Sequence, residues 1–179
     1  MAIIHYQFEA IHPFYDGNGR VGRILNILFL IDQDILDLPI LYLSRYIIDN
    51  KREYYLNLRA VTEENKWQEW ILYILEGVIE TAKFTREKIL TIQKIMYQTA
   101  QQIKEKLPKI FSKELVDIIF YHPYCKIKFL TDAKIAHRQT ASLYLKELEK
   151  IGILEGVKKG REIYYLNLAF VNYLNQQIQ

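Results

Sequence analysis

The sequence has few residues that interrupt regular structure and almost no cysteine. Its 179 residues include seven glycines, four prolines and a single cysteine, Cys125. One cysteine excludes an intramolecular disulfide, and the shortage of glycine and proline favours helices joined by few turns. The N-terminus lacks the basic segment, apolar segment and cleavage site of a secretory leader. We therefore expect a cytoplasmic protein.

Long apolar runs and a strong charge imbalance are also missing. The longest apolar run, residues 24–31, contains Asn26 and stops at Asp32, whereas a membrane-spanning helix needs about 20 apolar residues. With 24 basic and 21 acidic side chains, the net charge is +3, so the overall composition does not indicate a nucleic-acid partner. Half of the residues are hydrophobic, which suffices to bury one or two cores. We expect no membrane segment.

The apolar pattern of the first two thirds predicts an all-helical fold. Pro13 ends a first helix over residues 3–11, because the residue before a proline avoids the α region. From Arg20 to about Gln33, apolar residues recur at helical spacing and fill much of the opposite face. This second helix should therefore be largely buried. Further helical segments are predicted over residues 39–50, 51–61 and 67–107.

The character of the sequence changes after Pro108, which ends the long helix. Three helices and then two strands are predicted, over residues 111–121, 132–136, 139–151, 153–157 and 162–166. Three helices followed by a hairpin is the order of a winged helix-turn-helix domain. We therefore predict a mainly α protein, with a helical domain over residues 1–108 and a winged-helix domain with a small β-hairpin over residues 109–179.

Residues 12–23 form a glycine-containing loop that runs directly into the second helix. Gly17 and Gly19 relax the steric limits on the backbone, and the first turn of a helix exposes unpaired N–H groups. The helix dipole favours negative charge at this end, and Arg20 and Arg23 offer paired N–H donors to phosphate oxygens. The segment therefore predicts a polyphosphate site.

Two further side chains of the loop indicate chemistry beside that site. Asp16 would repel a bare phosphate, so its presence favours a hard cation such as Mg²⁺ between the carboxylate and the phosphate oxygens. The imidazole of His12 suits removal of a hydroxyl proton near neutral pH. A Ser, Thr or Tyr hydroxyl could then attack the phosphorus.

The order His12-Pro-Phe-Tyr-Asp-Gly-Asn-Gly-Arg-Val-Gly-Arg23 resembles the motif of the Fic family at every defined position. The resemblance implies a protein adenylyltransferase, an enzyme that transfers AMP from ATP to a Ser, Thr or Tyr hydroxyl of a target protein. It also implies that Phe14 packs inward and holds the loop. The implied roles are catalytic base for His12, Mg²⁺ ligand for Asp16, phosphate-binding turn for Gly17, Asn18 and Gly19, and outer-phosphate contacts for Arg20 and Arg23.

The resemblance extends to residues 43–55, which are similar to the segment that supplies adenine and ribose contacts in this family. Asn50 would pair its carboxamide with the adenine edge. Tyr54 or Tyr55 would stack on the base, unless both tyrosines belong to the core or to an interface.

The segment before the motif is short for the family. Fic domains usually place several helices and a β-hairpin flap there, whereas eleven residues precede His12. The flap aligns the backbone of the target beside the nucleotide, and the family's inhibitory helix is not recognisable. We expect a truncated Fic core with impaired activity, whose other half is lost or supplied by another chain. An exposed apolar face over residues 20–31 would favour a homo-oligomer or a partner.

The second domain has a local excess of basic residues. Residues 122–166 contain nine Lys or Arg and five Asp or Glu, which is consistent with binding to a phosphate backbone. A stripe from Ala141 to Ile151 would face the core and leave the other side chains for DNA. The predicted DNA contacts are Arg138, Gln139, Ser142 and Lys146 on the helix and Lys158, Lys159 and Arg161 at the hairpin tip.

The function of the whole chain fits two hypotheses. It is an adenylyltransferase whose winged helix directs or regulates it, or a DNA-binding transcriptional regulator with a non-catalytic Fic remnant. The intact motif favours the first hypothesis, and the short front end favours the second. Residues 131–137 make a shorter helix-turn segment than the winged-helix pattern has, so a domain used for protein contacts or dimerisation is a further alternative.

Overall fold

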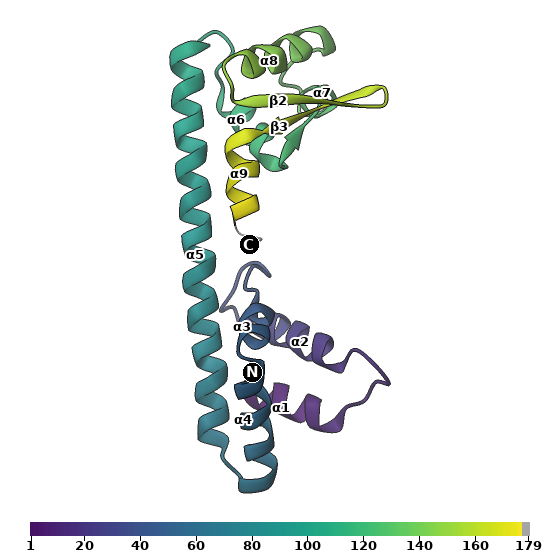
Figure 1. Cartoon of the computed structure of the whole chain (residues 1–179), viewed down its shortest axis with the longest axis vertical. Helices are drawn as coiled ribbons and strands as arrows, with labels where there is room; N and C mark the ends of the chain where they lie inside the picture. Colours follow the sequence, from purple (N-terminus) through teal and green to yellow (C-terminus); the bar gives the residue numbers. More distant parts are fainter. Residues whose placement is uncertain (177–179) are drawn as a thin grey trace. The chain divides into compact units, whose positions relative to one another are not determined.

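The computed structural model describes residues 1–176 and is mainly helical, with a three-stranded antiparallel sheet near the C-terminus (Figure 1). The predicted mainly α fold class is confirmed. The chain divides into two compact units, Met1–Lys88 and Ile89–Gln179. Residues 177–179, the end of the predicted second domain, lie outside the described residues. No helix within residues 1–176 combines the length and the apolar character that a membrane crossing requires.

The first unit consists of helices joined by short connections. Its elements are α1 (Ala2–Ile11), α2 (Asn18–Asp32), α3 (Leu43–Asp49), α4 (Lys51–Glu64) and α5 (Trp67–Lys106). The last of these is 40 residues long and passes from the first unit into the second. The predicted breaks at Pro13 and Pro108 agree with the ends of α1 and α5.

Aromatic rings fill the core of the first unit. Trp70 on α5 is fully buried, and its ring lies 5.6–6.2 Å from the rings of His5, Tyr54 and Tyr73. The indole N–H of Trp70 donates to the carbonyl of Ala2 (2.9 Å). These contacts hold α1 against α5, and α2 packs against α1.

Small and polar residues make up most of the buried face of α2. The buried positions follow a spacing of one helical turn and are Asn18, Gly22, Asn26 and Leu30. Ile24 and Leu28 stay 56% and 53% exposed. The prediction of a largely buried helix was therefore wrong, because α1 covers the polar stripe of α2 and the apolar residues point elsewhere.

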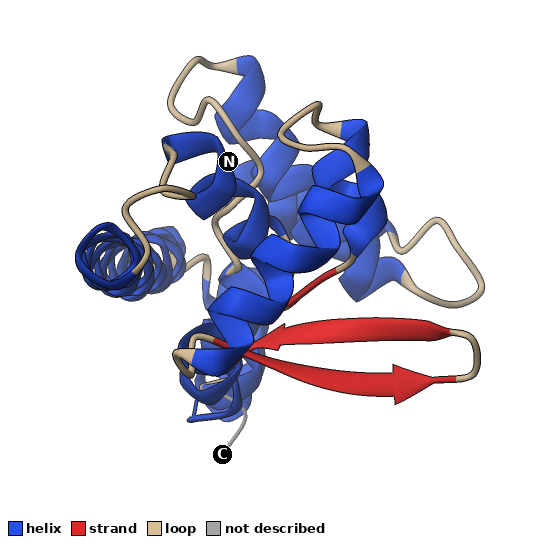
Figure 2. Ribbon diagram, turned by 90° about the horizontal axis from the view of Figure 1, so that it is seen from above, coloured by secondary structure: helices blue, strands red, loops and turns tan. Residues whose placement is uncertain are grey.

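The second unit packs the end of α5 and four further helices against a small sheet. Its elements are α6 (Lys113–Tyr121), β1 (Tyr124–Cys125), α7 (Ile127–Asp132), α8 (Arg138–Lys150), β2 (Leu154–Lys159), β3 (Glu162–Asn167) and α9 (Leu168–Gln176). The strand order is β1-β3-β2, and β3 pairs antiparallel with both neighbours. Because β1 pairs with Tyr165 and Leu166 alone, the outer part of the β2–β3 hairpin is a two-stranded ribbon (Figure 2).

The core of the second unit is aliphatic. Its fully buried side chains include Ile103, Leu115, Ile119, Leu130, Leu145 and Leu148. Cys125 is also fully buried, and burial raises the pKa of its thiol to about 12.

Three elements of this unit differ from the prediction. The helix predicted over residues 132–136 lies earlier, at α7, because the chain turns after Asp132: Lys134 has φ 56°, and the N–H of Ile135 donates to the carbonyl of Leu130 (3.0 Å). The strand β1 and the helix α9 were not predicted. Two residues are too few for β1 to show an alternating pattern.

Candidate functional site

His12 stands at the junction between α1 and the motif loop. It caps α1 in the left-handed conformation (φ 50°, ψ 56°), and its N–H donates to the carbonyl of Phe8 (3.0 Å). The imidazole Nδ1 lies 3.3 Å from the carbonyl oxygen of Glu9, and the side chain is exposed. The Nε2 atom on the other edge of the ring is therefore the one that can meet an incoming hydroxyl.

Asn18 holds the motif loop from inside. Its Oδ1 accepts from the N–H of Phe14 (2.9 Å), and its Nδ2 donates to the carbonyl of Phe14. The side chain is 2% exposed. Any contact of Asn18 with a phosphate would therefore use its backbone N–H. Phe14, predicted to pack inward, is half exposed and meets the ring of Phe8 at 6.2 Å.

The start of α2 is open to an anion. Gly17 is the N-cap and has φ 85°, a conformation that costs little for glycine alone. Glycine has no side chain that could accept from the first-turn N–H groups; the N–H of Arg20 donates to the Gly17 carbonyl (3.0 Å), and those of Asn18 and Gly19 receive no side-chain cap. Arg20 lies over this turn, since a Cβ on Gly17 would be 3.3 Å from its Nη2 atom.

Asp16 and Arg20 face each other across the same turn. The Oδ1 of Asp16 accepts from the N–H of Gly17 (2.7 Å), and its Oδ2 lies 3.5 Å from the Arg20 Nη2. Both side chains are more than two-thirds exposed, so this ion pair is weak and can open for a ligand. The carboxylate is the kind of oxygen ligand that Mg²⁺ takes. No group of three acidic, His or Cys side chains gathers within residues 1–176, so phosphate oxygens and water would complete the coordination.

Arg23 is positioned by α3. Its Nε donates to the Ser44 Oγ (3.0 Å), and its Nη1 would be 3.2 Å from a Cβ on Gly19. The side chain borders a hollow of about 270 Å³ whose wall is mostly apolar and includes Ile24 and Leu28. Arg20 and Arg23 thus lie beside Gly17 and Gly19 respectively.

A buried polar cluster supports the loop from behind. His5 is fully buried between Tyr54, whose hydroxyl lies 2.9 Å from Nε2, and Asn26, whose Nδ2 lies 3.2 Å from Nδ1. A neutral imidazole can accept at one of these two nitrogens and donate at the other. Burial lowers the pKa of His5, which agrees with the neutral form. Sequence reasoning missed this cluster; Asn26 within an apolar run was its signal.

Glu9 is the member of this cluster that lies next to the motif loop. Its Oε1 is buried and has no hydrogen-bond partner within the described residues. Burial raises the pKa of the Glu9 carboxyl, and the nearby His12 and Arg23 partly oppose this shift. A Cβ on Gly22 would lie 2.5 Å from this oxygen, so the glycine provides the room that Glu9 occupies.

The predicted adenine contacts lie in different environments. Tyr54 is 5% exposed and belongs to the core, whereas Tyr55 is 57% exposed. Asn50 caps α3, donates from Nδ2 to the Tyr46 carbonyl (2.9 Å), and borders a hollow of about 280 Å³ beside Arg45. The amide oxygen of Asn50 and the ring of Tyr55 are therefore the groups available to a ligand.

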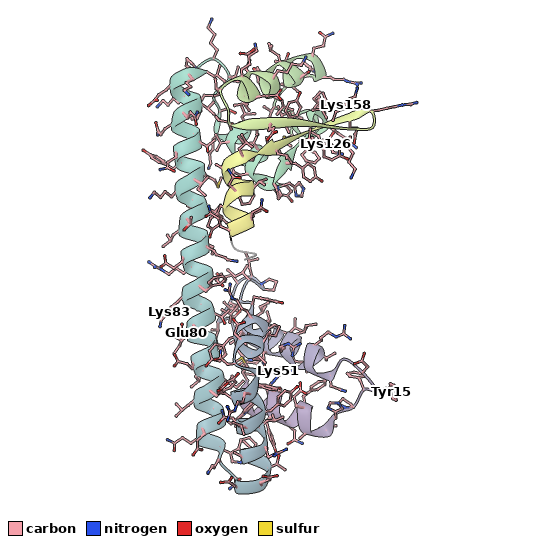
Figure 3. All side chains as sticks on the ribbon, viewed as in Figure 1. Tyr15, Lys51, Glu80, Lys83, Lys126 and Lys158 are labelled. Carbon is pink, nitrogen blue, oxygen red and sulfur yellow. The ribbon has the colours of Figure 1, made fainter. Side chains whose placement is uncertain are left out.

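The second unit contains a separate group of predicted contacts. Arg138, Gln139 and Lys146 are exposed on α8, and Ser142 is half-buried. Lys158, Lys159 and Arg161 are exposed on the hairpin, and Figure 3 shows Lys158 extending away from it. The structure brings Arg138 and Arg161 to one hollow of about 560 Å³, together with Lys126 and Lys128, which sequence reasoning missed.

Comparison with known proteins identifies the family. Residues 1–30 match the Fic/DOC family, and residues 95–170 match the domain described as "Protein adenylyltransferase SoFic-like, C-terminal domain". The chain is a Fic/DOC family protein with a SoFic-like C-terminal domain and a partial Fic domain at its N-terminus, as its motif predicted.

A curated relative is similar to part of the chain. The probable protein adenylyltransferase aq_aa38 of Aquifex aeolicus (strain VF5) is 49% identical over 45 residues. These residues are 25% of this chain and 14% of that relative. The aligned region thus represents a small part of the relative's length.

Proposed function

We propose that the chain is a protein adenylyltransferase that uses ATP with Mg²⁺. The observation that carries this proposal is the loop between α1 and α2. There, an exposed imidazole, a carboxylate and an uncapped helix start with two arginines lie within twelve residues. This set of groups matches the needs of a hydroxyl attacking a nucleotide phosphate.

The proposed reaction assigns a role to each group. His12 Nε2 takes the proton of a Ser, Thr or Tyr hydroxyl, and the hydroxyl oxygen attacks the α-phosphorus of ATP while the bond to pyrophosphate breaks. The first-turn N–H groups of α2 and the Arg20 and Arg23 guanidinium groups hold the phosphates. Mg²⁺ at Asp16 would neutralise phosphate charge. Asn50 and Tyr55 are proposed to contact the base, while Tyr54 supports the site through His5.

A labelling experiment tests this function. Cell lysate is incubated with the chain, Mg²⁺ and ATP labelled on the α-phosphate, and His12→Ala is compared with His137→Ala, an exposed histidine of the second unit. We expect weak labelling of target proteins with the parent and with His137→Ala, because the partial Fic domain impairs activity, and none with His12→Ala. Equal labelling by His12→Ala would contradict the role of His12 as base.

The proposal includes expectations about assembly and location. The exposed Ile24 and Leu28 leave an apolar face on α2 that a second copy or a partner chain would cover. We propose that the chain alone has impaired activity until such a partner completes the site, and that it works in the cytoplasm. Light scattering during size-exclusion chromatography would report whether the isolated chain is larger than a monomer.

DNA binding by the second unit is a second candidate function. The order α6-β1-α7-α8-β2-β3 agrees with a winged-helix domain over residues 109–179, in which α8 would enter the major groove and the hairpin would be the wing. The exposed Arg138 and Gln139 at the start of α8 and the basic hairpin favour this candidate. The alternative role for the same unit is protein contact or dimerisation. The DNA-binding experiments described for this unit distinguish the two roles.

A further inference from the structure

Three cationic side chains from three elements converge on one hollow of the second unit. Lys128 comes from α7, Arg138 is the first residue of α8, and Arg161 lies in the turn of the β2–β3 hairpin. The hollow has a volume of about 560 Å³. Within residues 1–176, none of these three side chains forms an ion pair.

The carboxylate in the hollow is already engaged. Glu162 accepts from the Lys126 Nζ (2.7 Å) and from the Tyr164 hydroxyl (3.2 Å), and the Lys126 Nζ also bonds that hydroxyl (3.0 Å). Lys126 further lies over the Tyr164 ring at 4.1 Å. Glu162 therefore balances Lys126 and also attracts Lys128, so one carboxylate faces four cationic side chains and the hollow keeps an excess of positive charge.

The same contacts hold the hairpin in place. A two-stranded ribbon is marginally stable by itself, and the side chain of Lys126, the residue before α7, bonds Glu162 at the start of β3. Arg161, next to Glu162, is an exposed residue of the hairpin turn and borders the same hollow as Arg138.

We propose that this hollow binds phosphate groups of a nucleic-acid backbone, with Lys128, Arg138 and Arg161 as the contacts. Like charges that converge in excess of their counter-charge repel one another, and an anion removes that repulsion. Two of the three are arginines, whose planar guanidinium groups match phosphate oxygens in pairs. Lys158 and Lys159 continue the positive charge along the hairpin beyond the hollow, a distribution that suits a polymer rather than a single small anion. This inference rests on the DNA-binding candidate above and assigns it a site.

The test compares two triple variants with the same change in net charge. One removes the contacts, Lys128→Gln with Arg138→Gln and Arg161→Gln. The control removes exposed lysines outside the hollow, Lys104→Gln with Lys109→Gln and Lys113→Gln. Fluorescence anisotropy with a labelled random-sequence duplex is measured over a series of KCl concentrations. Circular dichroism checks that both variants remain folded.

We expect the hollow variant to weaken binding more than about tenfold near physiological salt and to reduce the slope of log K against log salt by roughly 2 to 3, since each lost phosphate contact contributes about 0.9. The control should stay near the parent. Equal weakening by both variants would overturn the site and leave DNA binding intact, because diffuse charge would then explain the affinity. A parent that binds no duplex would overturn both.

Free phosphate is distinguished by a second measurement. Inorganic pyrophosphate is titrated into the parent and the hollow variant by calorimetry. Weak or undetectable binding to both supports a backbone site, whose affinity depends on several linked phosphates. Micromolar binding to the parent that the variant loses would instead identify a small-anion site and overturn the assignment to nucleic acid. Neither measurement depends on transferase activity.

Discussion

The Asn18 side chain pairs with both polar backbone groups of Phe14, accepting from its N–H at 2.9 Å and donating to its carbonyl. The motif loop is thereby closed on itself by a residue that is 2% exposed. A loop of this kind keeps its shape without a ligand, so the positions of Asp16 and Gly17 depend on Asn18.

Removing this bridge should destabilise the first unit. Asn18→Ala removes both partners of the partly buried N–H and C=O groups of Phe14, and we expect the free energy of unfolding to fall by about 1–2 kcal/mol. Both tryptophans, Trp67 and Trp70, lie in the first unit, so urea unfolding followed by tryptophan fluorescence reports on it alone. Gln68→Ala, at an exposed position of α5, is the control. An Asn18→Ala midpoint equal to that of the parent would show that the bridge adds no stability.

A double-mutant cycle should measure the energetic coupling between Gly22 and Glu9. An added methyl at position 22 would lie 2.5 Å from the Glu9 Oε1 and 3.1 Å from the His5 Cε1. We expect Gly22→Ala to cost about 1–3 kcal/mol through overpacking, and Glu9→Ala to recover part of that loss in the double variant. Glu53→Ala, at an exposed residue of α4, should recover nothing. Additive effects of Gly22→Ala and Glu9→Ala would rule out their contact.

The buried imidazole predicts a pH dependence of stability. Burial lowers the pKa of His5 in the folded state, so the unfolded chain binds more protons as the pH falls below its ordinary value of 6.5. Stability should therefore decrease from neutral to mildly acidic pH, by up to about 1 kcal/mol per pH unit.

His5→Gln provides the comparison for this prediction. Burial raises the pKa of Glu9, which acts with the opposite sign, but Glu9 is present in both proteins. We expect the parent to lose more stability than His5→Gln between about pH 7.5 and about pH 5, measured by urea unfolding with tryptophan fluorescence. His137→Gln in the second unit should behave as the parent does. Parallel pH profiles of the parent and His5→Gln would refute a buried neutral imidazole.

Nucleotide binding should depend on the groups around the α2 start. We expect Arg23→Ala and Asp16→Ala to weaken Mg-ATP binding at least about tenfold in titration calorimetry, because each removes a charged partner of the phosphates or the metal. Arg59→Ala, an exposed arginine of α4, is the matched control. If Arg23→Ala and Asp16→Ala bind Mg-ATP as the parent does, the phosphate site lies elsewhere.

If the second unit binds DNA, substitutions at Lys159 and at Gln139 should distinguish phosphate contact from base recognition. Lys159→Glu should weaken binding to all duplexes alike, with a steeper effect at low salt, because it contacts phosphates. Gln139→Ala, at the start of α8, should change which sequence is preferred, because it is placed to meet base edges. Mobility-shift series across salt concentrations measure both, with Lys113→Glu as control. No shift of the parent with any duplex would leave protein contact as the role of this unit.

Local sequence was sufficient to predict the elements around the motif. Pro13 and Pro108 bound helices, and the glycine turn before Arg20 marks a helix start, since each acts within a few residues of itself. The family followed from twelve consecutive residues for the same reason. The predicted position of α7 was wrong because the helix ends at a turn in which Lys134 has a positive φ. Such a turn is usually indicated by glycine, and this one has none.

Contacts between distant residues could not be predicted. His5 bonds Tyr54 across 49 positions, and Lys126 bonds Glu162 across 36, so no local pattern relates them. The same holds for the exposed side of α2. Its apolar residues resemble core positions in sequence, and whether a neighbour covers them depends on tertiary structure.

The buried Cys125 thiol gives the second unit a chemical reporter that the first unit lacks. A thiol-reactive dye needs an accessible thiolate, and this sulfur is enclosed by the core of the unit, with its pKa raised to about 12. Dye incorporation therefore proceeds only as fast as that core opens. Because the tryptophans report on the first unit and the cysteine on the second, the opening of each half can be timed separately in one unmodified chain.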